Sequence, residues 1–201
     1  GSERAALEAQ VAGAGLNGLV LNTAGKLDVT NCVFQNFGGA PPDGNGILLQ
    51  HATGSPKIGI VDTTSSYNVN AGILYDVRTT VTATIGIHRS TLAGNGDSGL
   101  VVRGSSSVGP VIAVTDTLSA RNSRDGFNLD SVGLKVEIDQ TIAADNVRHG
   151  FFIGSSAGAV IGRSSALGNG QFGLAAQHLV VRRLHACGQF GTKAQPLRLG
   201  R

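Results

Sequence analysis

The 201-residue chain lacks methionine and tryptophan, and it has only two cysteines. Cys32 and Cys187 lie near opposite ends of the sequence, so they offer neither a disulfide framework nor the Cys/His spacing of a zinc site. No apolar run approaches the roughly 18 residues that a membrane-spanning helix needs, which predicts no membrane span. The lack of methionine predicts that the natural start codon lies outside this sequence, together with any signal segment.

Charged residues are also scarce, at 14 % of the chain, and they are unevenly distributed. All 13 acidic residues precede residue 146, whereas seven basic residues follow residue 145. This asymmetry predicts a positively charged end, which either serves solubility alone or faces an acidic polysaccharide or another polyanion. Aromatic residues make up only 4 % of the chain, which argues against nucleic acid as the partner.

Glycine, by contrast, is abundant, with 30 residues. It follows no strict three-residue period, so the chain is not collagen-like. Hydrophobic residues make up 41 % of the sequence, which excludes general disorder. At about 150 residues per domain, the length predicts a single domain.

A short motif, a glycine followed by an apolar segment, recurs along the chain. The seven copies are NGLVLN at residue 17, NGILLQ at 45, AGILYD at 71, SGLVVR at 98, DGFNLD at 125, HGFFIG at 149 and FGLAAQ at 172. Successive glycines of the motif are 28, 26, 27, 27, 24 and 23 residues apart. Such regular spacing predicts a repeat architecture.

A second motif lies between the copies of the first. It begins with a β-branched residue, and five copies end in an asparagine: Asn68, Asn95, Asn122, Asn146 and Asn169. Both motifs are short, alternate with period two and are bounded by Gly, Ser, Asn and Asp, which indicates β-strands. Coils of 23–28 residues built from short parallel strands form a β-solenoid. The L-x-x-L-x-L pattern of leucine-rich repeats is missing.

The asparagine column has a physical explanation in such a fold. Stacked coils lie about 4.8 Å apart, so side-chain amides in one column can bond from coil to coil as a ladder. We also expect these asparagines to adopt the left-handed conformation that a tight turn demands.

The units G-[ILF]-x-[VIL] followed by V-x-x-[ST]-x-[AS]-x-x-N resemble the repeats of right-handed parallel β-helix proteins of the pectate-lyase-like superfamily. They are most similar to bacterial, exported β-helix repeat proteins that mostly lack an assigned function. The resemblance implies an all-β, right-handed parallel β-helix of about seven coils over residues 17–190. Residues 1–16 are then an N-terminal cap or partial coil, and residues 191–201 are a C-terminal tail. Residues 3–12 suit either a short capping helix or the remnant of a coil.

Period two also predicts which side chains of the glycine-containing strands point outward. Most of them are apolar: Val20, Leu48, Leu74, Val101, Asn128, Phe152 and Ala175. Contiguous apolar stripes mark contacts. We therefore expect either the tail or a second copy of the chain, in a homo-oligomer, to cover this stripe.

In the enzymes that the repeats resemble, the first strand of each coil and its flanking turns carry the catalytic groups. The corresponding catalytic candidates here are His88, Arg89, Asp116, Glu137 and Asp139, and the substrate-binding candidates are Lys135, Arg163, Arg182 and Arg183. Clustered carboxylates repel one another, so at least one pKa should rise, as a general acid requires. The same oxygens could instead hold calcium, although no metal site is assigned. Alternatively, opposite charges on adjacent coils neutralise one another.

Three functions fit these observations. The first is an exported β-helix protein, secreted or at the bacterial cell surface, that interacts with cell-surface or extracellular polysaccharide without catalysis and without a cofactor. The second is a lyase or hydrolase acting on an acidic polysaccharide. The third is a structural module that associates with itself through the apolar stripe. The short connections between strands, the longest around residues 39–44, favour the first.

Overall fold

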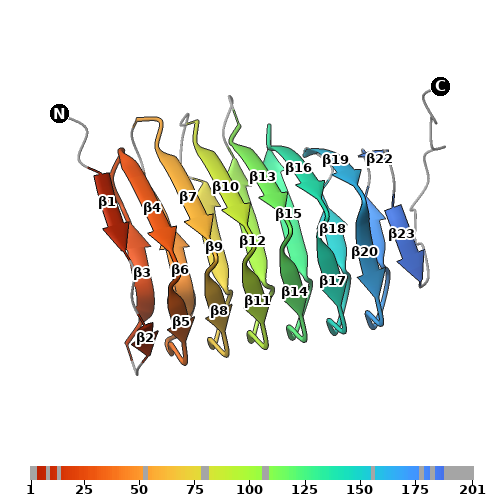
Figure 1. Ribbon diagram of the computed structural model, residues 1–201, viewed down its shortest axis with the longest axis horizontal. Coiled ribbons are helices and arrows are strands. Elements are labelled where there is room, and N and C mark those ends of the chain that lie inside the picture. Colours follow the sequence, from red (N-terminus) through yellow and green to blue (C-terminus); the bar gives the residue numbers. More distant parts are fainter. Residues whose placement is uncertain are drawn as a thin grey trace.

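The computed structural model is an elongated all-β solenoid (Figure 1). It describes the backbone of residues 4–7, 10–12, 15–51, 54–77, 82–105, 109–154, 157–176, 179–181 and 184–187. Side chains are described for residues 15–51, 54–77, 82–104, 109–154 and 157–176. Within these ranges every regular element is a strand, so none of them contains a helix that could cross a membrane.

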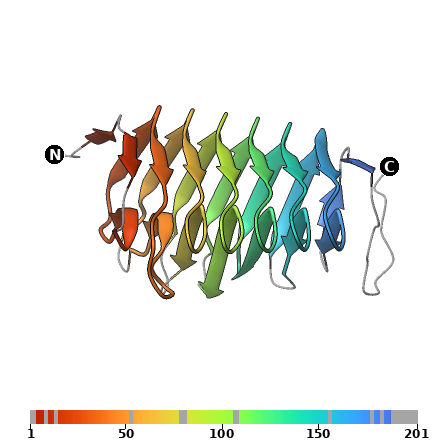
Figure 2. The same cartoon turned by 90° about the horizontal axis from the view of Figure 1, so that it is seen from below.

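The strands form three parallel sheets, called A, B and C, that run along the solenoid (Figures 1 and 2). Sheet A contains β1 (Arg4–Leu7), β4 (Lys26–Thr30), β7 (Lys57–Val61), β10 (Thr84–His88), β13 (Val111–Thr115), β16 (Lys135–Asp139), β19 (Gly158–Gly162) and β22 (Leu179–Val181). Sheet B contains β2 (Gln10–Ala12), β5 (Val33–Gln35), β8 (Thr64–Ser66), β11 (Thr91–Ala93), β14 (Leu118–Ala120), β17 (Ile142–Ala144), β20 (Ser164–Leu167) and β23 (Leu184–Cys187). Sheet C contains β3 (Asn17–Leu21), β6 (Asn45–Leu49), β9 (Ile73–Val77), β12 (Leu100–Ser105), β15 (Phe127–Val132), β18 (Phe151–Ile153) and β21 (Leu174–Ala176).

This arrangement confirms the all-β parallel solenoid expected from the repeats. Each coil passes through sheet C, then A, then B, so a strand pairs with its counterpart one coil away. The N-terminal strands β1 and β2 pair in parallel with β4 and β5. Residues 4–7 and 10–12 therefore contribute strands of a partial coil and do not form a capping helix. The tail at residues 191–201 lies outside the described residues, as do the side chains of Arg182 and Arg183.

The core is built from columns of equivalent side chains. Alternate residues of each sheet A strand point inward and stack in register, coil upon coil. One such buried column contains Val29, Ile60, Ile87, Val114, Ile138 and Ile161. From sheet C, Phe127 and Phe151 stack with ring centroids 5.1 Å apart. β-Branched and aromatic side chains fit this pleated interior well, which explains their frequency in the repeats.

The predicted asparagine ladder is present between sheets B and C. The Nδ2 of Asn68 donates to Oδ1 of Asn95 at 3.0 Å, and Asn95 donates to Asn122 at the same distance. The bonds from Asn122 to Asn146 and from Asn146 to Asn169 are each 2.9 Å long. Each acceptor oxygen also receives the backbone N–H of the preceding asparagine. The ladder therefore satisfies buried backbone groups that the turn leaves unpaired.

We expected the ladder asparagines to adopt the left-handed conformation of this turn, and that prediction was wrong. Positive φ angles belong to the residue before each ladder position: Asn36, Tyr67, Gly94, Arg121, Asp145 and Gly168, with φ between 54° and 67°. The asparagine side chain is instead committed to the ladder. An L-residue other than glycine pays roughly 1–2 kcal/mol for the left-handed conformation. A second left-handed corner follows sheet A, at Asn31, Asp62, Arg89, Asp116, Gln140 and Arg163.

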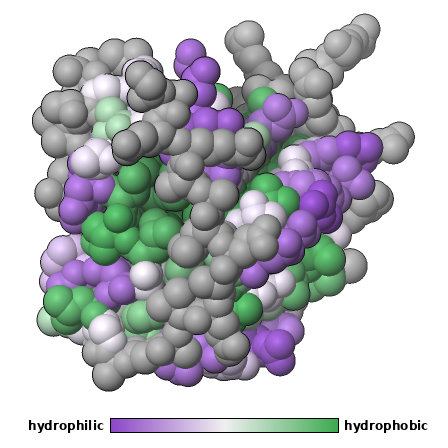
Figure 3. Space-filling view, turned by 60° about the vertical axis from the view of Figure 1, so that its left-hand side comes forward, coloured by the Kyte–Doolittle hydropathy of each residue, from purple (hydrophilic) through white to green (hydrophobic). Residues whose placement is uncertain are grey.

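The apolar stripe on sheet C is covered over much of its length. Leu48, Leu74 and Val101 occupy consecutive coils in register and are buried within a single chain. A partner copy is thus not required to cover these three side chains. Leu16 and Val20 remain exposed near the N-terminal end. Figure 3, which brings this end forward, shows hydrophobic surface bordered by hydrophilic residues.

Candidate functional site

The predicted site lies on the outer face of sheet A. Three residues of each strand point outward, and equivalent residues stand side by side on adjacent coils. Along the chain these outward triplets are Lys57, Gly59 and Val61; Thr84, Gly86 and His88; Val111, Ala113 and Thr115; and Lys135, Glu137 and Asp139. Beyond each triplet comes the left-handed corner residue. Burial alternates along each of these strands, so the three side chains of each triplet lie on one face.

Arg89 does not point toward a cluster of carboxylates but binds one of them directly. Its Nε and Nη2 donate to the two oxygens of Asp62, at 2.7 Å each. Both residues are left-handed corner residues on adjacent coils. The guanidinium group lowers the pKa of Asp62, chiefly by this hydrogen bonding. Arg89 is therefore engaged in a bidentate pair with a residue that the sequence analysis did not include in the site.

Arg163 and Asp139 form a similar bidentate pair three coils further along, with Asp139 at the end of β16. Nε of Arg163 donates to Oδ1 of Asp139 at 3.1 Å, and its Nη2 donates to Oδ2. The hydrogen bonds from Arg163 lower the pKa of Asp139. This is opposite to the rise expected for one member of an unpaired carboxylate cluster, because a cation compensates the charge. Asp139 is thus held as a carboxylate, which does not suit a general acid.

His88 and Asp116 form a third contact between coils. Nδ1 of His88 lies 2.6 Å from Oγ1 of Thr115 and 3.3 Å from Oδ2 of Asp116. Both side chains are partly exposed. The ring is thereby oriented along the sheet by a hydroxyl and a carboxylate. Of the candidate catalytic groups, this pair comes nearest to an oriented acid–base arrangement.

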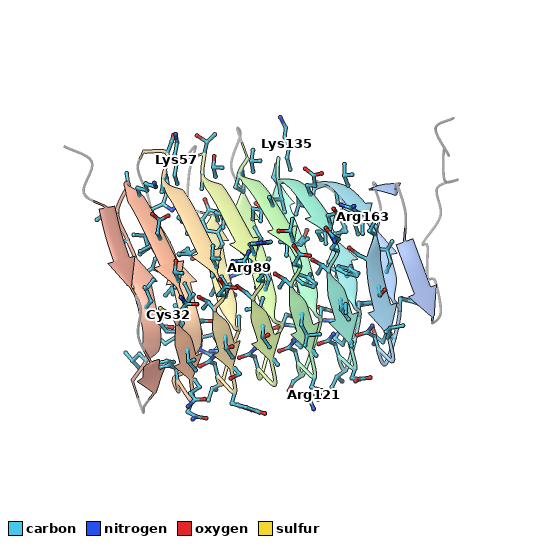
Figure 4. The ribbon with its side chains drawn as sticks, viewed as in Figure 1. Cys32, Lys57, Arg89, Arg121, Lys135 and Arg163 are labelled. Atoms are coloured by element: carbon cyan, nitrogen blue, oxygen red, sulfur yellow. The ribbon has the colours of Figure 1, made fainter. Side chains whose placement is uncertain are left out.

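The remaining candidates are more dispersed. Lys135 and Asp139 lie at opposite ends of β16, four residues apart, which is about 13 Å along a strand. In Figure 4, Lys57 and Lys135 extend from one edge of the solenoid, whereas Arg89 and Arg163 lie further down the sheet. Glu137 is exposed between the two ends of β16. Among the described residues, no three His, Cys, Asp or Glu side chains converge as a metal site would require, including a calcium site.

The middle outward positions of three adjacent sheet A strands have no side chain or only a methyl group. Gly59, Gly86 and Ala113 are in register on β7, β10 and β13, midway along each strand. A Cβ atom added to Gly86 would have no atom within 4 Å. Glycine weakens a strand interior, and it often marks a place where a ligand or another backbone approaches closely. We call these three residues the small-residue track.

Comparisons with known proteins add one structural likeness. No family model matches the chain, and neither does any curated protein. The chain is similar to the crystal structure of pectate lyase Pel9A, with 15 % sequence identity and a TM-score of 0.49. The similarity covers 87 % of this chain and 57 % of the pectate lyase. The likeness is one of fold. The chain thus spans a little over half the length of that enzyme.

Beyond sheet A, the structure contains a recess that the sequence analysis did not find. It has an empty volume of about 280 Å³ and lies on sheet C, where Pro41 and Pro42 face Leu74 and Val101. Asp97 and Arg103 contribute polar groups to its lining. The sequence signals for it were the first repeat spacing of 28 residues and the long connection around residues 39–44.

Bonds to neighbouring strands hold the connection that carries the two prolines. Asn17 donates to Oδ1 of Asp43 at 2.6 Å, and Nδ2 of Asn45 donates to Oδ1 of Asn17 at 3.0 Å. Asn70, one coil further on, donates to the backbone carbonyl of Asp43. These side chains belong to three consecutive coils, so the connection is attached along the solenoid and not only at its own ends.

A buried acid–base pair lies on the same side of the solenoid. Nδ1 of His149 lies 2.7 Å from Oδ1 of Asp125, and both side chains are almost completely buried. Oδ1 of Asp125 also accepts the backbone N–H of His149, and its Oδ2 accepts Nδ2 of Asn128. The imidazole ring packs against Phe152 and Phe172. The sequence does not indicate this pair, because the neighbours of His149 across the coils are not visible in it.

Proposed function

We propose that this chain binds an extended acidic polysaccharide on the outer face of sheet A, without transforming it, and that it acts outside the cell. The observation that carries the proposal is the small-residue track of Gly59, Gly86 and Ala113, which is flanked by Lys57 and Thr84 on one side and by His88 and Thr115 on the other. A polymer lying along the solenoid axis can approach the backbone there. The track is level over three consecutive coils, or about 10 Å from the first strand to the last.

The charges beside the track suit an anionic polymer. Lys57 and Lys135 lie on one side, three coils and about 14 Å apart, where they would meet carboxylates at two separate points along the polymer. Both ammonium groups project from the edge of the solenoid (Figure 4). On the other side, His88 and Thr115 offer hydrogen-bonding groups. Exposed cations of this kind contribute salt-dependent attraction more than fixed geometry.

The carboxylates on sheet A are engaged with basic side chains, which favours binding over the lyase or hydrolase alternative. Asp139 is paired with Arg163 and its pKa is lowered, and Asp116 lies beside His88. A lyase would instead need a group free to take a proton from the sugar, and calcium or a cation to hold the uronate. The His88–Asp116 contact is the feature that keeps the enzymatic alternative worth testing.

The deciding experiment combines binding with product detection. Polygalacturonate, alginate and a neutral glucan are titrated into the protein at 50 mM and 500 mM NaCl, and the same mixtures are assayed for unsaturated and reducing products, with and without calcium. We expect binding of an acidic polymer that weakens at least tenfold at the higher salt, with no product. Product formation that disappears in Asp139→Asn would replace the binding function by the enzymatic one.

Two variants locate the binding surface. Gly86→Val fills the open space of the track and should weaken binding at least tenfold, while the fold is retained because nothing lies within 4 Å of the added Cβ. Thr91→Val, which changes the outward face of sheet B, is the matched control and should bind as the wild type does. If Gly86→Val bound the polymer as tightly as the wild type does, sheet A would be excluded as the binding surface.

A further inference from the structure

Tyr67 combines two properties that a structural role alone does not explain. Its backbone is left-handed, with φ of 55°, at the corner between sheets B and C. Its side chain is 65 % exposed, so burial of the ring does not compensate for the unfavourable conformation. At the equivalent position other coils carry Asn36, Asp145 and Gly168, residue types that tolerate this conformation. Strained residues that gain nothing from packing are found preferentially at functional sites.

The next coil leaves room for the tyrosine ring. Gly94 occupies the equivalent corner, and a Cβ atom there would lie 2.7 Å from Cε1 and 2.8 Å from Cδ1 of Tyr67. The ring therefore extends along the solenoid axis and rests directly against Gly94. The backbone N–H of Tyr67 also bonds to the carbonyl of Ala93 at 3.1 Å, which places the two corners side by side. Any side chain at residue 94 would displace the ring.

One coil beyond Gly94, the corner residue is Arg121. The N–H of Gly94 donates to the carbonyl of Ala120 at 3.0 Å, so Arg121 follows Gly94 in the column as Gly94 follows Tyr67. Arg121 is left-handed as well, with φ of 54°. Within the described part of the chain its guanidinium group has no ion pair, in contrast to Arg89, Arg103 and Arg163. Figure 4 shows Arg121 extending from the edge of the solenoid opposite Lys57 and Lys135.

We propose that Tyr67 and Arg121 form a second binding site, on which a hexuronate residue of the acidic glycan stacks its apolar C–H face on the tyrosine ring and places its carboxylate on the guanidinium group. Tyrosine presents an apolar ring with a polar end, and arginine binds a carboxylate through two parallel hydrogen bonds. The ring lies against Gly94, and Arg121 is the next corner of the same column. The acidic nature of the sugar rests on the proposed function, but the site lies away from sheet A.

The tyrosine content of the chain allows a direct test. The sequence has no tryptophan and only two tyrosines, and the second, Tyr75, is buried. Acrylamide quenching of tyrosine fluorescence thus reports mainly on Tyr67. We expect digalacturonate to protect the wild-type protein from quenching, whereas a neutral disaccharide protects it much less. By calorimetry, Tyr67→Asn and Arg121→Gln should each weaken digalacturonate binding at least fivefold. Val69→Ala, an exposed neighbour, is the matched control.

The outcomes separate this site from the track on sheet A. Unchanged digalacturonate binding in Tyr67→Asn, or a melting temperature lowered by several degrees in that variant, would show that the ring has only a structural role against Gly94. Protection that survives Gly86→Val supports two separate sites. If Gly86→Val loses polymer binding and digalacturonate does not protect Tyr67 from quenching, the second site is overturned and the proposed function stands. Equal protection by a thymidine oligonucleotide would overturn the assignment to a sugar, because bases also stack on tyrosine.

Discussion

Asp125 accepts a hydrogen bond from the ring of His149 across adjacent coils, with Oδ1 2.7 Å from Nδ1, in a site where both side chains are buried. The carboxylate has three further interactions, with the backbone N–H of His149, with Asn128, and with Arg148 at 3.9 Å. A buried carboxylate is tolerated only when its oxygens are satisfied in this way.

Removing Asp125 should therefore be costly. We expect Asp125→Ala to lower the free energy of unfolding by about 3–5 kcal/mol, the range for breaking a buried pair from one side. Asp145→Asn, at an exposed corner position, should change it by less than about 1 kcal/mol, and urea denaturation of both variants compares them. Similar midpoints for the two variants would mean that the Asp125–His149 bond contributes little.

The asparagine ladder gives a second prediction. Asn122 is fully buried, its Nδ2 bonds to the Leu92 carbonyl, Ser119 and Asn146, and its Oδ1 accepts from Asn95. Asn122→Ala leaves several buried polar groups without partners, at about 1–3 kcal/mol each. We expect a total loss of about 3 kcal/mol or more in the free energy of unfolding.

The control for the ladder is an exposed asparagine. Asn22 accepts a single hydrogen bond from Gln50 at the surface, so Asn22→Ala should cost no more than about 0.5 kcal/mol. Thermal denaturation of the two variants measures the difference. If Asn122→Ala melted within 2 °C of the wild type, as Asn22→Ala should, the ladder would be incidental to stability.

Two glycines on adjacent coils should respond in opposite directions to alanine. A Cβ at Gly99 would lie 2.0 Å from Oγ of Ser119 and 2.8 Å from the carbonyl of Gly126, whereas Gly86 faces open space. Gly99→Ala should destabilise by about 1–3 kcal/mol, as overpacking does. Gly86→Ala should stabilise by roughly 0.5–1 kcal/mol, because glycine is unfavourable within a strand. Chemical denaturation curves give both values, and a stabilised Gly99→Ala would contradict the close contact.

The two arginine–aspartate pairs on sheet A predict how stability responds to acid. Folding lowers the pKa of Asp62 and Asp139, so their charged forms stabilise the folded state above the ordinary carboxyl pKa of about 4. This contribution is lost as the pH falls through the lowered values. Between pH 5 and pH 2 we therefore expect the melting temperature of the wild type to fall more steeply than that of a variant carrying both Asp62→Asn and Asp139→Asn. Because both ion pairs lie at the surface, 1 M NaCl should reduce this difference between the two pH dependences. Equal pH dependences of the two melting temperatures in low salt would refute the prediction.

The sequence predicted the fold well because the information is repeated. Equivalent positions recur in every coil, so glycine spacing, period two and the asparagine column each indicate the same parallel stacking. The ladder was predicted at Asn68, Asn95, Asn122, Asn146 and Asn169, and all five take part in it. The left-handed corner was misplaced by one residue, since the same residue type suits both a ladder and a left-handed turn.

The candidate site was predicted less completely, because its chemistry depends on which neighbours pair. The outward direction of His88, Glu137 and Asp139 follows from period two, but the pairing of Arg89 with Asp62 depends on the reach of a long side chain across coils. Tyr67 gave no pattern, since a single tyrosine among other residue types in a corner column carries no periodic signal. The strain at Tyr67 becomes visible only with its backbone angle.

The unequal repeat lengths of the solenoid have a consequence for how such a chain can change. Fifteen residues separate the start of sheet A from the next repeat glycine in five successive coils, as from Lys57 to Gly72 and from Thr84 to Gly99, whereas the connection from sheet C back to sheet A varies in length. The constant segment contains the residues that form the core columns and the ladder, so a change in its length would shift them out of register. Insertions and deletions are therefore tolerated only between sheets C and A, or, as the Pro41–Pro42 segment shows, just after a ladder position. New recognition loops can be grafted at those two points while the scaffold keeps its register.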